Sequence, residues 1–374
     1  MKFVIPSTEL LNHLQLMGKV MNSKNTLPIL DNILLRLQEG KLTIMASDLE
    51  TTLISELAVP SVQEEGSVAV PRMMAESLKE FPEQPLTVTV APDTFQIEIS
   101  WATGKLTLPG FDPQEFPKIP EIGEGATTVN FEASTLNDGI LKTIFASAAD
   151  ELRPVMNGIY FDMTGECATF VASDAHKLVR YRRPDVKVDS NTSFILPKKP
   201  ASLLRTILTK EQDAVEVTFD SKNAAFRLSG YQLVCRLIEG NFPAYNTVIP
   251  TDNPNKVSMD RVELLSVVKR IAPLGPAGTG LIRLKLSENQ ITILAQDLEF
   301  AQSGVERIAC QYEGDELEIG FKSAFLIEIL TNLHTQEVSL EFSDSSRAGL
   351  ILPVGEDPEK EDTLMLLMPM MINA

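Results

Sequence analysis

One sequence pattern occurs three times along the chain, at intervals as long as a whole domain. The copies are residues 43–50, 169–176 and 292–299, and each places a threonine, two apolar residues and an alanine ahead of an aspartate. The spacings between these aspartates are 126 and 123 residues. Because solenoid repeats are only about 20–50 residues long, each copy is predicted to belong to a full domain.

The order of predicted secondary structure repeats as well. Each copy begins with a short strand and a helix, and continues with strands and a second helix. The six helical segments are predicted at 7–24, 71–81, 134–148, 197–210, 259–271 and 321–334. The predicted fold class is therefore α+β: three repeated domains, each with two helices packed on antiparallel sheet.

Two runs rich in proline, glycine and polar residues, at 121–125 and 250–255, are typical of linkers. They predict three domains: 1–124, 125–254 and 255–374. A charged run at 355–362 is predicted to be a solvated loop.

Composition indicates an ordinary globular chain, with 44% hydrophobic and 22% charged residues. Cys167, Cys235 and Cys310 lack metal-site spacing and favour reduced thiols in a cytosolic protein. The N-terminus has no apolar stretch of the signal-peptide kind, and the apolar run at 364–372 is too short to span a bilayer. We therefore expect a cytoplasmic protein without membrane contact.

Charge is distributed unevenly along the sequence. The net charge of −18 alone argues against nucleic acid as a partner, but the six helical segments contain 13 basic and 7 acidic residues. Such helices would attract a phosphate backbone, although lysines on helices also serve solubility. The scarcity of aromatic residues in these segments argues against single-strand stacking and favours contact with a duplex backbone.

Motifs for catalysis are weak. The segment Gly275–Gly280 lacks the lysine of a phosphate-binding loop, and the three histidines are isolated, which disfavours a metal site. Residues 173–176 include the residue types of a Ser-His-Asp triad, but adjacency in one turn does not supply triad geometry. The recurring aspartate is expected to stabilise a turn. The end of the chain, 366–371, is either a core strand or a methionine-rich peptide-binding surface.

Several motifs in a characteristic order carry a family resemblance. They are 1–3, 26–30, 47–50, 173–176, 241–243 with Tyr245, 287–290 and 368–370. Over its entire length the chain resembles the β sliding clamps of bacterial replicative DNA polymerase. The resemblance implies a homodimeric ring around double-stranded DNA, with no catalysis, cofactor or metal. It implies that the replicative polymerase, the clamp loader, and repair polymerases or ligase bind through short peptide motifs.

The resemblance also implies three sets of site residues. The peptide pocket would consist of Met156, Ser173, Ala175, His176, Lys177, Leu178, Pro243, Thr247, Val248, Ser346, Leu366, Met368, Pro369 and Met370. DNA would be contacted by Lys24, Arg72, Lys79, Lys142, Arg153, Lys198, Lys199, Arg205, Lys269 and Arg270. The dimer contact would involve Leu106, Leu108, Pro273 and Leu274.

The chain departs from the family pattern at a few of these positions. The family often has glycine in place of Ala175 and arginine in place of Lys177, Thr247 and Met371. The chain also continues past the usual end, to Ala374. An enzyme that uses His176 and a scaffold that binds only proteins are the alternative functions.

Overall fold

The computed structural model describes residues 1–189 and 191–372, so the last two residues of the third predicted domain lie outside the described part. The chain divides into two compact units. Unit 1 contains residues 1–134 and 203–237, and unit 2 contains 135–202 and 238 onward. The middle third of the sequence therefore contributes to both units.

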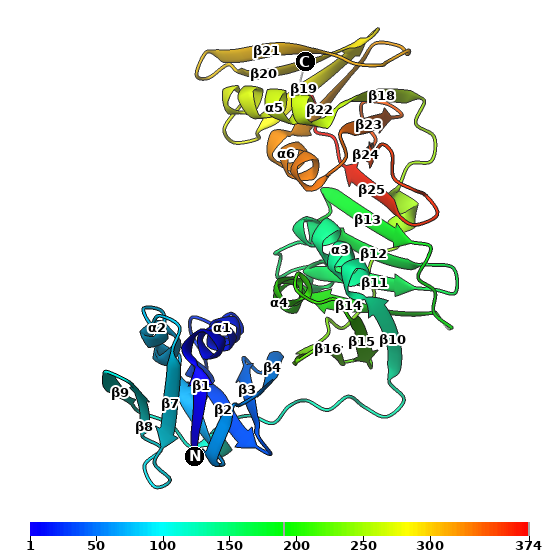
Figure 1. Ribbon diagram of the computed structural model, residues 1–374. Coiled ribbons are helices and arrows are strands. Elements are labelled where there is room, and N and C mark those ends of the chain that lie inside the picture. Colours follow the sequence, from blue (N-terminus) through cyan, green and yellow to red (C-terminus); the bar gives the residue numbers. More distant parts are fainter. Residues whose placement is uncertain (190, 373–374) are drawn as a thin grey trace. The chain divides into compact units, whose positions relative to one another are not determined.

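Unit 1 contains two antiparallel sheets (Figure 1). The smaller has the order β5-β1-β7-β8-β9, with β1 (Lys2–Pro6), β5 (Ser61–Glu64), β7 (Pro85–Val90), β8 (Ile97–Trp101) and β9 (Gly104–Leu108). The larger has the order β10-β15-β16-β17-β4-β3-β2-β6. Its strands are β2 (Asn32–Gln38), β3 (Lys41–Ser47), β4 (Thr51–Ala58), β6 (Gly66–Pro71), β10 (Thr127–Glu132), β15 (Ala214–Phe219), β16 (Asn223–Leu228) and β17 (Tyr231–Arg236).

Two helices pack on unit 1, α1 (Ser7–Gly18) and α2 (Met73–Leu78), and they lie side by side. Leu10, Leu14 and Met17 of α1 are fully buried, because residues three and four apart share one helix face. The same face contacts β1 and β3, which fixes α1 on the sheets.

Unit 2 also contains one larger and one smaller antiparallel sheet (Figure 1). Its larger sheet has the order β14-β11-β12-β13-β25-β24-β23-β18, and its smaller sheet β21-β20-β19-β22. The larger contains β11 (Gly158–Met163), β12 (Ala168–Ser173), β13 (Lys177–Arg183), β14 (Thr192–Pro197), β18 (Asn255–Asp260), β23 (Glu337–Phe342), β24 (Gly349–Pro353) and β25 (Asp362–Leu367). The smaller contains β19 (Leu281–Ser287), β20 (Gln290–Asp297), β21 (Gln302–Ala309) and β22 (Leu317–Lys322).

Helices α5 (Arg261–Ile271) and α6 (Ser323–Asn332) lie side by side in unit 2 and pack on these sheets. Asp260 caps α5, since its side chain accepts a hydrogen bond from the amide of Glu263. The remaining helices, α3 (Ala133–Thr143) and α4 (Lys198–Leu208), each begin in one unit and end in the other. Short 3-10 turns are η1 (Pro28–Asp31), η2 (Pro113–Glu115), η3 (Ile144–Ala146), η4 (Pro154–Met156), η5 (Tyr245–Val248) and η6 (Ala272–Leu274).

The helices are shorter than predicted, which changes the charge distribution. Within their observed ends the six α-helices contain seven basic and five acidic residues, so the predicted surplus of positive charge is smaller. Several basic residues lie just outside, such as Lys19, the C-cap of α1, and Lys79, the C-cap of α2. Positive charge therefore concentrates at helix ends rather than along helix faces. Within the described residues, no helix is long and apolar enough to cross a membrane.

Candidate functional site

The three recurring aspartates have one local role, which confirms the predicted turn. Oδ1 of Asp48, Asp174 and Asp297 accepts hydrogen bonds from the backbone amides of the second and third residues after it, at 2.6–3.2 Å. Leu49 and Ala175, the residues after the first two aspartates, have positive φ angles of 77° and 72°. The sequence repeat therefore encodes a tight turn between two strands.

The turn at Asp174 does not have the geometry of a catalytic triad. Ser173 Oγ donates to the carbonyl of Lys177 at 2.9 Å and accepts from the amide of Ala175 at 3.2 Å. Asp174 bonds backbone amides and the Lys177 ammonium. The hydroxyl and the carboxylate are thus both used to hold the turn.

A cavity of about 260 Å³ lies beside this turn in unit 2. Ten of its lining residues belong to the predicted pocket: Met156, Ser173, Ala175, His176, Lys177, Leu178, Pro243, Val248, Leu366 and Met368. The structure adds Phe242, Ala244 and Tyr245. Segments far apart in sequence meet here because β13 pairs with β25, which brings the end of the chain next to the turn.

The other four predicted pocket residues lie outside this cavity. Ser346, Pro369 and Met370 line a second hollow of about 540 Å³ in the same unit. Thr247 is exposed in η5, where its hydroxyl donates to the carbonyl of Ala244. Their part in peptide binding stays a prediction.

Two added lining residues could have been found from the sequence, since Phe242 and Tyr245 belong to a quoted motif. The ring of Phe242 stacks on Tyr160 at 4.9 Å, and the hydroxyl of Tyr245 donates to Asp162 at 2.9 Å. Burial and this hydrogen bond raise the pKa of Tyr245. Both aromatic residues therefore form a fixed wall of the cavity.

The buried polar groups of the lining are occupied by internal partners. Lys177 is 5% exposed, and its ammonium contacts Asp174 at 2.6 Å and Glu328 at 3.0 Å. Burial opposes ionisation of Asp174, but hydrogen bonds from the Lys177 ammonium and from backbone amides lower its pKa. The cavity therefore offers mainly apolar surface, together with the exposed ring of His176.

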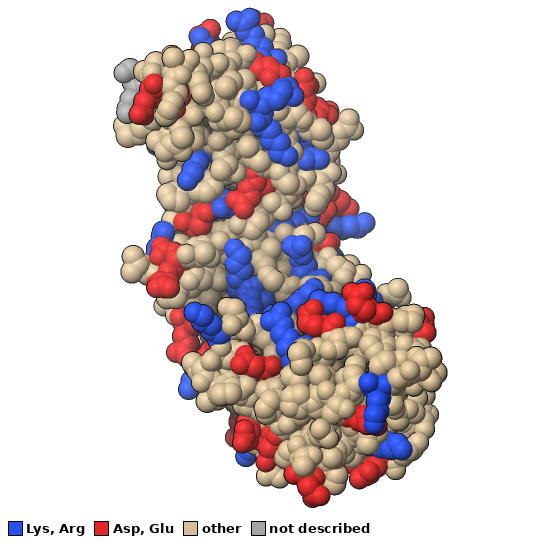
Figure 2. Space-filling view, turned by 90° about the vertical axis from the view of Figure 1, so that its left-hand side faces the viewer, with Lys and Arg blue, Asp and Glu red and all other residues tan. Residues whose placement is uncertain are grey.

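Most of the residues predicted to contact DNA are accessible. The exposed ones are Lys24, Arg72, Lys79, Arg153, Lys198, Arg205, Lys269 and Arg270, and Lys199 is half-buried. Among them, Lys79 pairs with Glu76, Arg153 with Asp150, and Arg270 with Glu306. Figure 2 shows basic and acidic side chains interspersed on one face. Contact of these residues with DNA stays a prediction.

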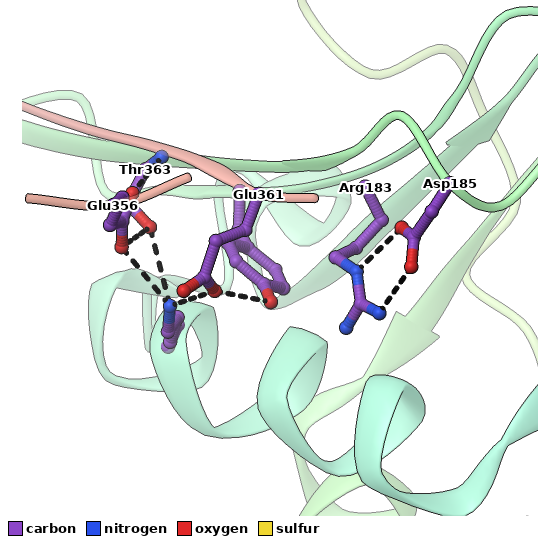
Figure 3. A network of polar contacts seen from close by, with 7 residues as sticks. Arg183, Asp185, Glu356, Glu361 and Thr363 are labelled. Atoms are coloured by element: carbon purple, nitrogen blue, oxygen red, sulfur yellow. Dashed lines mark hydrogen bonds and ion pairs between the residues drawn. The ribbon is translucent and has the colours of Figure 1, made fainter. Parts of the chain in front are cut away.

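Lys142 differs from this group because it pairs with two carboxylates of unit 2, Glu356 and Glu361, which Figure 3 labels. Its ammonium lies 3.2 Å from Glu356 and 2.7 Å from Glu361, and 4.4 Å from the ring centroid of Tyr181. The hydroxyl of Tyr181 also donates to Glu361. Residues 355 and 357–360 of the charged run are exposed, as predicted for a solvated loop, whereas Glu356 and Glu361 are bound by Lys142.

The predicted dimer residues lie at or near sheet edges. Leu106 and Leu108 belong to β9, an edge strand of unit 1, and are half-buried and buried. Leu274 lies beneath β21, an edge strand of unit 2, where a Cβ at Gly304 would be 2.5 Å from its Cδ1. Pro273 is exposed next to it.

Comparison with known proteins gives one consistent family. Residues 1–120, 130–244 and 246–371 match models of the N-terminal, central and C-terminal domains of the DNA polymerase III beta subunit. A beta sliding clamp of Pseudomonas putida is 29% identical over 372 residues, covering 99% of this chain and 100% of the relative. That of Vibrio cholerae is 26% identical, covering 96% and 97%.

Solved structures give the same similarity. A DnaN sliding clamp of Pseudomonas aeruginosa bound to griselimycin aligns with a TM-score of 0.94 and 27% identity, covering 100% of both chains. The beta subunit of Thermotoga maritima aligns with a TM-score of 0.90 and 24% identity, also over both full chains, which supports the fold.

Proposed function

Because the chain belongs to the bacterial DNA polymerase III beta subunit, or sliding clamp, family, we propose that it encircles duplex DNA as a homodimer. It acts in replication as a sliding clamp, a processivity factor without catalytic activity. Its partners would be the replicative polymerase, the clamp loader, and repair polymerases or ligase. We place these functions in the cytoplasm, and we propose domain boundaries at 124/125 and 254/255.

The cavity beside Asp174 carries the proposal that partner enzymes dock by short peptides. Its wall is apolar and aromatic, and Lys177, Ser173 and Tyr245 have internal partners. A charged side chain would therefore lose its hydration there without gaining a partner. A short peptide with apolar residues at its end fits this chemistry, and the family resemblance implies that the peptide also contains a glutamine. Such tethering raises the effective concentration of an enzyme at DNA without new contacts to its active site.

Self-association is supported by the way the repeats already join within the chain. Strand β17 pairs with β4, and β25 pairs with β13. In both pairs the first strand named is the last strand of its repeat, and the second is the strand that follows the aspartate turn of another repeat. Cys235 lies opposite Thr51 in the first junction, and Leu367 opposite Lys177 in the second. The equivalent strands β9 and β21 are edge strands, which present unpaired backbone groups.

The two internal junctions predict the register between two copies. When the paired strands of the repeats are aligned residue by residue, Leu108 occupies the position of Cys235, and Gln302 occupies the position of Thr51. We therefore propose that Leu108 lies opposite Gln302 of a second copy, and Leu106 opposite Gly304. The missing side chain at Gly304 would let Leu106 reach the leucine beneath β21. A head-to-tail contact of this kind closes into a ring when its rotation permits.

DNA would be held by enclosure rather than by affinity. Basic residues at helix ends would contact phosphates without reading sequence, and such contacts weaken with salt. Enclosure lets these contacts stay weak while dissociation remains slow.

Retention on DNA tests the proposal directly. Protein loaded on nicked circular DNA by a clamp loader should stay bound in high salt and leave when the circle is linearised. Equal loss from both forms would refute the clamp, and binding to neither would favour a protein-only scaffold. Leu106→Asp should abolish retention and reduce the solution mass to that of one chain. Thr107→Asp, an exposed neighbour, is the matched control.

A further inference from the structure

The turn at Asp174 has an ion pair for which the other two repeats have no counterpart residue. In all three repeats Oδ1 of the aspartate accepts the same backbone amides. In the second repeat Oδ2 also accepts from the Lys177 ammonium at 2.6 Å. The third residue after the aspartate is Thr51 in the first repeat and Phe300 in the third, and neither carries a charge. The added contact thus occurs in the turn that lines the cavity.

Lys177 is buried enough to require this compensation. Its side chain is 5% exposed, and an ammonium at such a site is costly unless it is paired. Its second carboxylate partner is Glu328 on α6, whose Oε2 lies 3.0 Å from the ammonium. Glu328 is 39% exposed and is not among the residues that line the cavity.

Helix α6 holds a second residue of the same turn. The ring of His176 stacks on Phe325 of α6, with centroids 5.6 Å apart and an interplanar angle of 23°. The Lys177 ammonium also lies 4.6 Å from the centroid of Phe325. One face of α6 therefore contacts and positions two adjacent lining residues, His176 and Lys177.

The same turn also positions a third lining residue. The carbonyl of His176 accepts a hydrogen bond from the amide of Met368 at 2.8 Å. A change in the conformation of the turn would therefore displace His176, Lys177 and Met368 together. All three residues line the cavity.

We propose that Glu328 is a positioning residue of the peptide pocket. It acts through Lys177: together with Asp174 it fixes the ammonium, and the ammonium holds the turn and the His176 ring in the conformation that shapes the cavity. Without Glu328, Lys177 retains the Asp174 carboxylate but loses its ion pair to α6, so the ammonium and the turn are held less firmly. The functional part of this inference rests on the proposed function, because it concerns the affinity of the same pocket.

The test compares Glu328→Gln, which removes only the charge, with Glu341→Gln. Glu341 is a matched control, because it pairs with Lys256 at 3.0 Å in the same unit and does not line the cavity. Anisotropy of a short fluorescein-labelled peptide with one glutamine and a Leu-Phe end measures affinity, and thermal unfolding measures stability. In protein with ¹³C-labelled histidine, the His176 ring resonances report its position over Phe325, with Phe325→Leu as reference.

We expect Glu328→Gln to weaken the peptide about fivefold, to shift the His176 resonances, and to leave the Tm close to that of the control variant. Glu328→Asp should restore part of the affinity. In Lys177→Met protein, adding Glu328→Gln should have no further effect, because Glu328 acts through Lys177.

Unchanged affinity together with unshifted His176 resonances would overturn the proposal. A loss of affinity that follows only the loss of Tm would also overturn it, since that result indicates general destabilisation. Failure of the unmodified chain to bind the peptide would refute the proposed function instead. The His176 resonances of Glu328→Gln would still decide whether Glu328 positions the turn.

Discussion

Replacement of Lys142 by methionine distinguishes two roles for this residue. The family resemblance predicts a DNA contact, whereas the structure places the ammonium between Glu356 and Glu361 and against the ring of Tyr181 (Figure 3). Lys142 is 16% exposed, and the two carboxylates are 14% and 32% exposed. Methionine keeps most of the side-chain volume and removes the charge, so the two acids would face each other without a cation.

The magnitude follows from this partial burial. Loss of one partner from a fully buried pair costs about 3–5 kcal/mol, and from an exposed pair about 0–1 kcal/mol. We therefore expect Lys142→Met to lower the free energy of unfolding by about 2 kcal/mol. For a folding unit of about 150–250 residues this corresponds to a decrease in Tm of about 4–8 °C. Calorimetry measures it, and retention on nicked circular DNA over a range of salt concentrations measures the other role.

The control is Lys360→Met in the same charged run, because Lys360 is 75% exposed and lies 3.8 Å from Asp357. The free energy of unfolding should change by less than about 0.5 kcal/mol in Lys360→Met. Lys142→Met with an unchanged Tm and faster loss from DNA would refute the structural role. Adding Glu361→Gln to Lys142→Met should recover part of the lost stability, because it removes one of the two facing charges.

Two further predictions concern unit 2. Burial opposes ionisation of Glu361, but hydrogen bonds from Lys142 and Tyr181 lower its pKa below the ordinary 4.5. Its contribution to stability is therefore complete above pH 4.5 and is lost as the pH falls through the lowered pKa. Acid titration followed by circular dichroism should show that Lys142→Met loses less stability over this pH range than the unmodified chain. Gly158→Ala should cost about 1–3 kcal/mol in denaturant unfolding, since the new Cβ would lie 2.3 Å from the Leu196 carbonyl oxygen. Gly278→Ala, with no neighbour within 4 Å, should be neutral, and equal stability of the two variants would contradict the packing argument.

The sequence predicts the local elements well, because each is specified by nearby residues. Each of the six predicted helical segments overlaps one of the helices α1 to α6, and the aspartate turns have the predicted role. Helix ends are less well predicted: the first segment was predicted to extend to residue 24, whereas α1 ends at Gly18. Buried Met21 continues the apolar spacing of Leu14 and Met17 beyond the end of α1, so the spacing alone does not show where the helix ends.

The contacts that complete the site are not visible in the local sequence. Lys177 and Glu328 are 151 residues apart, and Lys142 is more than 200 residues from its carboxylates. Their meeting depends on the pairing of β13 with β25, which no periodicity within either strand specifies. The resemblance found ten lining residues of the cavity because it transfers such long-range register from solved structures.

The edge strands β9 and β21 have a consequence for the newly synthesised chain. Until two copies meet, each exposes unpaired backbone that any other extended segment can join, and such edges promote aggregation. Lys105 on β9 is 66% exposed, and Glu306 and Arg307 lie on β21, so charge at these edges disfavours wrong partners. The interval between synthesis and assembly is thus the period in which these two edges can pair with a wrong partner. A variant that cannot pair with a second copy would remain in this state, so its overproduction should yield more insoluble protein than overproduction of the unmodified chain.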